Sequence, residues 1–203
     1  MTNQLTNTEF PQDFQDAVTF HGHACPGLAI GYRAAKIALD KLAAQRPQDE
    51  EIVAVVENDA CGVDAIQWFL GCTFGKGNLV FKDYGKQAFT VFSRSRDKGV
   101  RVALRADALA TADDRGRELF QKVRDKTATE SEISEYQQRR QQQIMALIER
   151  PAHELFTVDM VDAPPPPPAR IHKSIICERC GEKVMETRAC IRDGQTVCVP
   201  CAE

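Results

Sequence analysis

The apolar positions along the chain predict helices that alternate with strands. Between residues 26 and 44 they recur with a helical period, and Pro26 suits the first position of a helix. A short β-branched run at residues 52–56 predicts a buried strand, and residues 62–71 predict a second helix. Residues 78–94 contain two apolar arms around the turn-forming sequence D-Y-G-K, a pattern that predicts a β-hairpin.

The second half of the chain continues this mixture. Residues 100–105 and 155–161 predict two further strands, whereas residues 113–150 are rich in Glu, Gln, Arg and Lys and predict two helices interrupted near residues 127–131. We interpret the charged stretch as a solvated helical pair packed on one sheet face, with a dimerisation arm as the alternative. Clustered strands with helices at both ends predict an α+β fold with a mainly antiparallel or mixed sheet.

Five consecutive prolines, Pro164–Pro168, divide the sequence. Such a run cannot form a helix or an inner strand, and it favours an extended polyproline spacer of roughly 16 Å. We therefore predict an α+β domain over residues 1–163, a linker over residues 164–169 and a separate mini-domain over residues 170–203. The alternative is an extended loop within a single domain.

Composition narrows the class of protein. The 203 residues are 43% hydrophobic and carry a net charge of -3, so we expect a packed core and no nucleic-acid partner. No apolar run approaches the ~20 residues that cross a bilayer, and residues 1–13 lack the apolar region of a secretory signal. We therefore expect a cytoplasmic protein with no membrane partner, in which the eight cysteines are reduced and available to metals.

Four cysteines near the C-terminus form a C-x2-C-x17-C-x2-C pattern: Cys177, Cys180, Cys198 and Cys201. Each C-x-x-C pair can place two sulfurs on one ion, and two pairs complete a tetrahedral Zn²⁺ site. The Asp193-Gly194 turn between them predicts a hairpin. We predict a zinc-ribbon or treble-clef-like module that needs structural zinc to fold, with two disulfides or iron as the alternatives. Cys190 is then a surplus strand residue.

A second group of metal-ligand residues lies near the N-terminus. His21, His23 and Cys25 have i, i+2, i+4 spacing, which would place their side chains on one side of an extended segment. Pro26 would put Cys25 at a helix N-terminus, where backbone amides and the helix dipole lower a thiol pKa. Cys61, between a predicted strand and a predicted helix, can complete a transition-metal site, which we expect to hold zinc. The alternatives are an N-cap cysteine with a hydrogen-bonded histidine pair, and a core thiol at Cys61.

Cys61, Cys72, Lys76 and Tyr84 are the candidate catalytic residues. A straight helix between Cys61 and Cys72 would separate their sulfurs by roughly 16 Å, so both cannot bind one ion in one protomer. We therefore expect Cys72 to have a separate role or to face a partner chain. Lys76 lies in a glycine-bracketed loop that can meet an anion, with an exposed turn residue as the alternative.

Several segments resemble FmdE, a component of formylmethanofuran dehydrogenase: F-H-G-H-A-C-P-G-L, V-E-N-D-A-C-G-V-D, G-C-T-F-G-K-G-N-L, K-D-Y-G-K-Q-A-F and the trailing I-C-E-R-C-G-E-K-V-M of longer FmdE family members. The resemblance implies a cytoplasmic, commonly dimeric α+β protein associated with the molybdenum or tungsten enzyme that reduces CO₂ onto methanofuran. It also implies either an accessory component of that enzyme or a stand-alone relative. The chain contains no pterin fingerprint and no ferredoxin-type cysteine run, so it is not the complete dehydrogenase.

Two functions follow from these residues. The first is a metal-dependent catalytic or accessory protein of one-carbon redox metabolism, with a second metal and a deep cleft at the histidine-cysteine group. The alternative is a regulatory protein whose zinc module contacts a protein or nucleic-acid partner and holds the only metal. Redox-enzyme subunits are expected partners of the first. We also expect a homodimer, because the helical arm, the proline spacer and Cys72 all suit contacts with a second copy of the chain.

Overall fold

The computed structural model describes residues 10–109 and 113–203, and the chain divides into two compact units, Met1–Pro168 and Ala169–Glu203. Most of the N-terminal segment on which the expectation about a secretory signal rests lies outside the described residues. Within the described ranges, no helix combines the length and the apolar character needed to cross a membrane.

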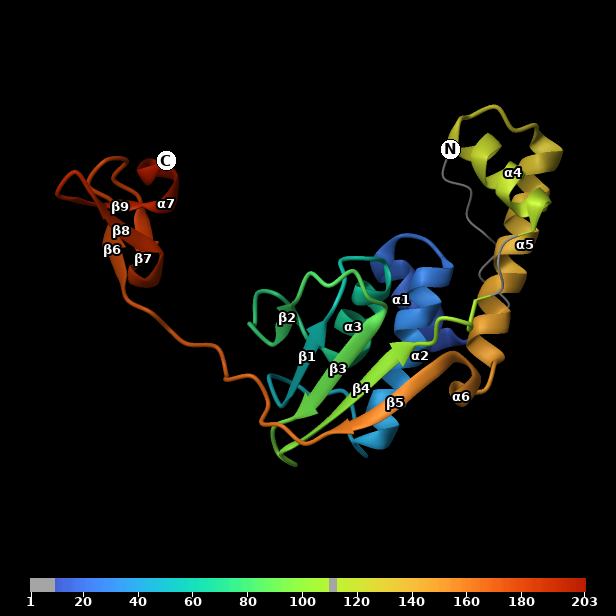
Figure 1. Cartoon of the computed structure of the whole chain (residues 1–203), viewed down its shortest axis with the longest axis horizontal. Helices are drawn as coiled ribbons and strands as arrows, with labels where there is room; N and C mark the ends of the chain where they lie inside the picture. The colour runs from blue at the N-terminus through green and yellow to red at the C-terminus, as the bar shows by residue number, and fades with distance from the viewer. Residues whose placement is uncertain (1–9, 110–112) are drawn as a thin grey trace. The chain divides into compact units, whose positions relative to one another are not determined.

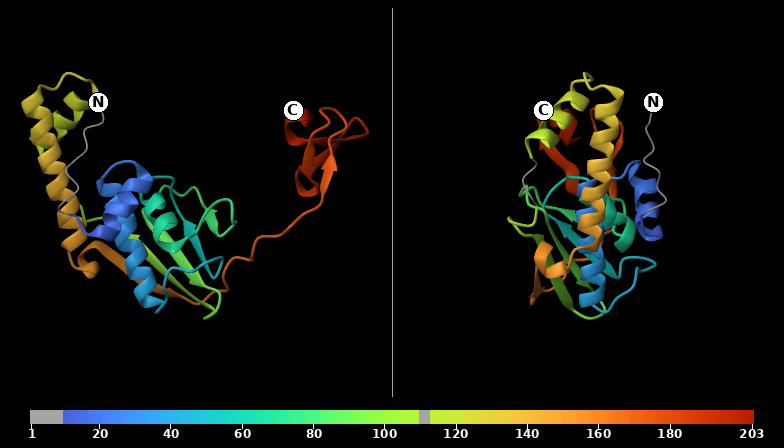
Figure 2. Two further views of the ribbon diagram at one scale, coloured as in Figure 1. Left: turned by 180° about the vertical axis from the view of Figure 1, so that it is seen from behind. Right: turned by 90° about the vertical axis from the view of Figure 1, so that its right-hand side faces the viewer.

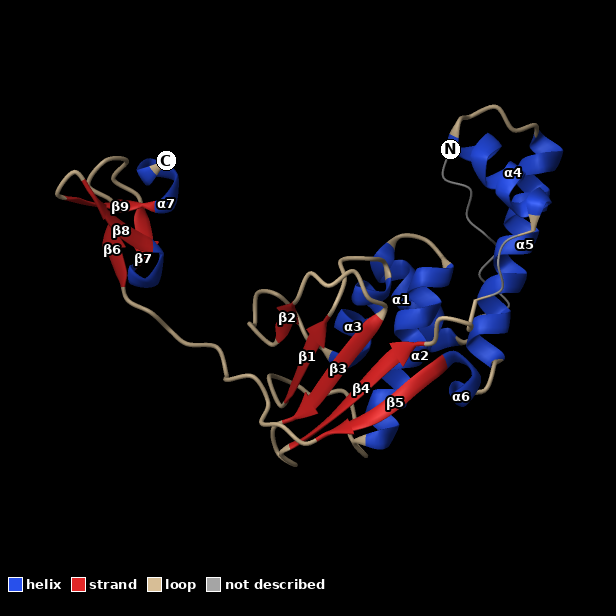
Figure 3. Ribbon diagram, in the orientation of Figure 1, coloured by secondary structure: helices blue, strands red, loops and turns tan. Residues whose placement is uncertain are grey.

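The first unit is built on a five-stranded sheet with the order β2-β1-β3-β4-β5 (Figures 1 and 3). Its strands are β1 (Ile52–Val56), β2 (Leu79–Phe81), β3 (Ala88–Ser93), β4 (Lys98–Leu104) and β5 (Phe156–Val161). β1 and β2 are parallel, and the other neighbours are antiparallel. The predicted α+β fold with a mainly antiparallel, mixed sheet is therefore confirmed. All five residues of β1 are buried, as its β-branched run predicts.

The predicted hairpin over residues 78–94 is wrong. Its two arms, β2 and β3, pair with opposite sides of β1 instead of with each other. The intervening residues continue the bonding to β1, since the Lys82 amide donates to the Val56 carbonyl and the Lys86 amide to the Glu57 carbonyl, both over 2.9 Å. A fully buried strand needs partners for its backbone groups on both sides, and this requirement outweighs the local turn signal.

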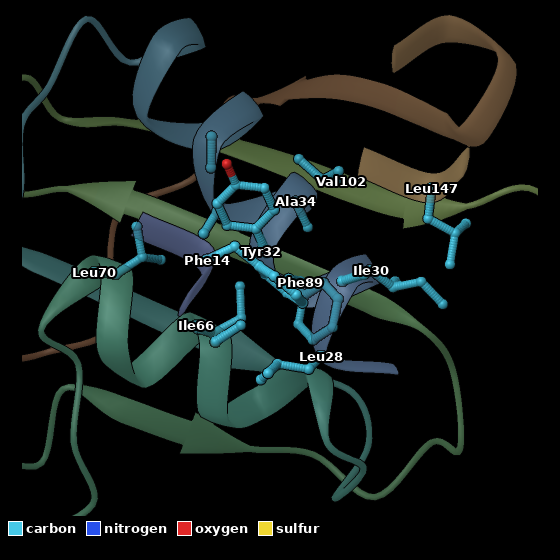
Figure 4. Close-up of a cluster of buried hydrophobic side chains, with 14 of the residues drawn as sticks. Phe14, Leu28, Ile30, Tyr32, Ala34, Ile66, Leu70, Phe89, Val102 and Leu147 are labelled. Carbon is cyan, nitrogen blue, oxygen red and sulfur yellow. The ribbon is translucent and has the colours of Figure 1, made fainter. Parts of the chain in front are cut away.

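Helices cover one face of the sheet. α1 (Gln12–His21), α2 (Pro26–Lys41) and α3 (Gly62–Leu70) lie together on this face, which Figure 2 shows from two further directions. The predicted helices at residues 26–44 and 62–71 are thus confirmed, whereas α1 was not predicted from the sequence. Phe14, Leu28, Ile66 and Phe89 meet in the core between helices and sheet and are fully buried (Figure 4).

The charged stretch forms α4 (Asp114–Arg124) and α5 (Glu130–Glu149), with the break where the sequence predicts it. Thr129 and Glu132 form a capping box that starts α5. The expected packing of this pair on a sheet face needs correction: α5 buries Ile144, Leu147 and Ile148 and packs mainly against α2. The short helix α6 (Ala152–Leu155) then leads into β5.

The second unit contains the paired strands β6 (Ser174–Ile176) and β7 (Lys183–Met185), the pair β8 (Ala189–Arg192) and β9 (Gln195–Cys198), and the helix α7 (Val199–Ala202). Asp193 and Gly194 join β8 to β9 with φ angles of 53° and 77°. Two consecutive positive φ angles are the mark of a type I′ hairpin turn. The predicted hairpin is confirmed.

Candidate metal centres

Two helix N-termini meet in the first unit because α2 and α3 cross without side chains between their backbones. A Cβ added to Gly31 would lie 2.0 Å from the Gly62 carbonyl oxygen, and one added to Gly27 would lie 3.2 Å from the Cys61 Cβ. Gly27 and Gly31 are four residues apart and therefore lie on the same face of α2. This close crossing places Cys25, the N-cap of α2, beside Cys61, the N-cap of α3.

The structure brings four predicted ligands together. One ligand atom from each of His21, His23, Cys25 and Cys61 lies within 4.8 Å of the others. The Cys25 Sγ is 3.8 Å from the His21 Nε2. Zn–S bonds of ~2.3 Å and Zn–N bonds of ~2.0 Å in a tetrahedron would place such atoms roughly 3.6 Å apart. The donor set therefore fits zinc or another borderline transition metal.

The local backbone differs from the extended segment expected from the sequence. His21 is the last residue of α1, Gly22 follows with φ 95°, and Cys25 is the extended N-cap of α2. The left-handed Gly22 reverses the chain between the two helices, a conformation that L side chains rarely adopt. The residues thus converge through a helix-turn-helix connection and not through strand-like alternation.

Asp64 completes the group and was not predicted from the sequence. Its Oδ2 accepts a hydrogen bond from the His21 Nδ1 over 2.6 Å, and its Oδ1 accepts one from the Gln67 side chain over 3.0 Å. A carboxylate on the second ring nitrogen fixes the tautomer and orients the imidazole toward a metal at Nε2. Asp64 lies three residues after Cys61 on α3, so helical spacing was the signal that could have revealed it.

The predicted lowering of the Cys25 pKa is wrong for the metal-free side chains. Burial raises the pKa of this thiol to about 11, although the Leu28 amide donates to its sulfur over 3.3 Å. Burial also lowers the pKa of His23, with smaller contributions from the positive charges of His21 and Arg140. The positive charge of Arg140 also acts on Cys25, where it favours the thiolate. A metal ion would provide the positive charge that a buried thiolate needs.

A surface cleft of about 450 Å³ borders the group. His21 and Cys61 line it together with nine other residues: Val56, Asn58, Asp59, Ala60, Val63, Asp64, Phe74, Leu79 and Phe81. His23 and Cys25 are not among its lining residues, so the expected cleft reaches half of the ligands. Phe74 and Phe81 are largely exposed and form an apolar rim.

The other catalytic candidates lie apart from this group. Cys72 is fully buried in the core and its Sγ contacts the Ile52 carbonyl at 3.5 Å, so it faces neither a partner chain nor the cleft. Burial raises the pKa of Cys72 to about 12, which disfavours a reactive thiolate. The Lys76 Nζ donates to the Asp49 carbonyl over 3.3 Å, and Tyr84 is exposed near Lys82. None of these three side chains lines the cleft.

The C-terminal cysteines form the second group. Ligand atoms of Cys177, Cys180, Cys198 and Cys201 lie within 4.8 Å of one another, as the spacing predicts. Backbone amides of Cys180 and Cys198 lower the pKa of Cys177 to about 6, which favours the thiolate that zinc binds. Cys190 is outside the group, exposed on β8.

Comparisons with known proteins agree with both groups. Residues 20–157 match the family model FmdE, described as molybdenum formylmethanofuran dehydrogenase operon, and residues 172–203 match the prokaryotic dksA/traR C4-type zinc finger. A crystal structure of an FmdE-like protein of tungsten formylmethanofuran dehydrogenase, from Syntrophus aciditrophicus, has the same fold, with a TM-score of 0.62, 22% identity and coverage of 99% of this chain and 96% of that one.

A curated protein from Archaeoglobus fulgidus, named a probable S-adenosyl-L-methionine-binding protein, is 35% identical over 192 residues. The match spans 92% of this chain and 51% of that protein. The chain therefore spans about half the length of this curated relative.

Proposed function

The chain belongs to the FmdE family, and we propose that it is a metal-dependent catalytic or accessory protein of one-carbon redox metabolism, associated with molybdenum or tungsten enzymes. The convergence of His21, His23, Cys25 and Cys61 on one point, with Asp64 behind His21, carries the proposal. When bound there, zinc would supply a Lewis acid for an oxygen or sulfur of the substrate.

The four ligands differ in how firmly the protein holds them. His21 is fixed by Asp64, and Cys25 is buried and bonded to the amide of Leu28. His23 is exposed. A zinc ion with four protein ligands has no open position, so substrate would have to replace one of them. We propose His23 as the ligand that is replaced.

The name of the Archaeoglobus fulgidus relative supports the same area of metabolism. S-Adenosyl-L-methionine carries a transferable methyl group, a one-carbon unit, and is therefore a candidate substrate for the matching half of that protein. The alternative function, a zinc module that contacts a protein or nucleic-acid partner, draws support from the dksA/traR match. It predicts one metal ion per chain, whereas the proposed function predicts two.

Replacing Cys61 with serine should reduce bound metal from about two equivalents to about one, measured by inductively coupled plasma mass spectrometry. Asp64→Asn should retain the fold and weaken affinity at the first centre by roughly 10–100-fold, because the carboxylate orients His21. Cys72→Ser is the matched control, since it removes a cysteine outside the group. One equivalent of metal in the unsubstituted protein would contradict the proposal and favour the alternative function.

We also propose a homodimer. Phe74 is 83% exposed and Tyr84 58%, an apolar surface near the cleft that a second copy could cover. Cys72 is buried within its own chain and does not contribute to such an interface. Sedimentation at micromolar concentration should give about twice the chain mass of 22.6 kDa. A species of single-chain mass would refute the dimer.

A further inference from the structure

A second cavity lies between the start of α2 and the α4–α5 hairpin. Its volume is about 430 Å³, and its lining combines aromatic and cationic side chains: Pro26, Gly116, Phe120, Tyr136, Arg139, Arg140 and Gln143. Pro26 directly follows the candidate ligand Cys25, so the cavity begins beside the first metal centre. It is separate in its lining residues from the cleft that reaches His21 and Cys61.

Arg140 is exceptional among the arginines of α4 and α5. Arg115 and Arg139 both pair with Glu135, and Arg124 pairs with Asp125. Arg117 pairs with Asp114. The Arg140 Nε is buried without a hydrogen-bond partner, and no ion pair joins this guanidinium to any residue within the described ranges.

Leaving such a group unpaired is costly. A buried polar or charged group that has lost water without gaining a partner destabilises the fold. The guanidinium cannot avoid this cost by losing its proton, because its pKa is too high. An unpaired arginine that lines a cavity is therefore explained most directly by an anionic ligand that pairs with it.

We propose that this cavity binds a small organic oxyanion, whose carboxylate or phosphate group pairs with Arg140 while Phe120 and Tyr136 contact its apolar part. A guanidinium presents parallel N–H donors that match two oxygens of either group. Phe120 is 52% exposed, an apolar area available to such a ligand. The proposal deepens the proposed function, on which it rests for the role of this anion as a substrate or effector of the neighbouring centre.

Titration calorimetry on the full-length, zinc-loaded protein tests the site with two probes, benzoate for the carboxylate and phenyl phosphate for the phosphate. We expect saturable binding of at least one probe near one equivalent. Arg140→Gln should weaken that binding at least tenfold, and Arg140→Lys should restore it in part. Arg124→Gln removes one charge from the same helical hairpin outside the cavity and should bind as the unsubstituted protein does.

Metal content, measured on each variant, separates the possible failures. Unchanged binding by Arg140→Gln, or binding of neither probe by the unsubstituted protein, would overturn the anion site. Loss of metal together with probe binding in Arg140→Gln would also overturn it, because Arg140 would then support the centre and not a ligand. Anion binding by a protein that holds only one zinc would uphold the cavity and contradict the proposed function of the first centre.

Discussion

Replacing Cys180 with serine should release about one equivalent of zinc and unfold residues 171–203. The described core of this module is small, with Cys177, Val197 and Cys198 as its buried cluster, and two of these three residues are candidate ligands. Hydrophobic burial alone cannot hold so small a unit together. Structural zinc contributes an apparent binding free energy of about 10–16 kcal/mol in comparable modules, so losing the ion removes most of the stability.

Zinc release and limited proteolysis measure this effect directly. Cys190→Ser is the matched control, because it removes an exposed cysteine of the same module that lies outside the metal group. The control should keep its zinc and its resistance to protease. A Cys180→Ser protein that retains both would show that zinc does not hold this module together.

Replacing Gly31 with alanine should have the second large effect, which we expect to disrupt the first metal centre from a distance. The new Cβ would lie 2.0 Å from the Gly62 carbonyl oxygen, so the backbones of α2 and α3 must move apart. Overpacking of this kind costs about 1–3 kcal/mol, and more where backbone meets backbone. The same movement would separate Cys25 from Cys61, which begin these helices, and weaken metal binding.

Chemical denaturation and metal analysis of Gly31→Ala check both consequences. Gly75→Ala is the control, because a Cβ at Gly75 would meet nothing within 4 Å and this residue has no left-handed backbone. We expect the control to retain the denaturation midpoint and about two metal equivalents. An unchanged midpoint and metal content in Gly31→Ala would mean that the helix crossing does not set the geometry of the centre.

Features carried by neighbouring residues could be predicted from the sequence alone. Apolar periodicity predicted α2 and α3, a β-branched run predicted β1, and the C-x-x-C pairs predicted the second cysteine group. Asp193-Gly194 predicted the turn between β8 and β9. Each of these signals acts within a few residues, because backbone dihedral preferences and the reach of a side chain are local properties.

Contacts between distant residues were decided by the tertiary structure. The buried strand β1 took β2 and β3 as partners on opposite sides, which the turn sequence between those strands could not reveal. The crossing at Gly31 and Gly62 brought Cys61 beside Cys25, and the α4–α5 hairpin brought Arg140 to Pro26. The residue types and spacings of the ligands were therefore readable from the sequence, whereas their convergence, the support of His21 by Asp64 and the burial of Cys72 depend on long-range packing.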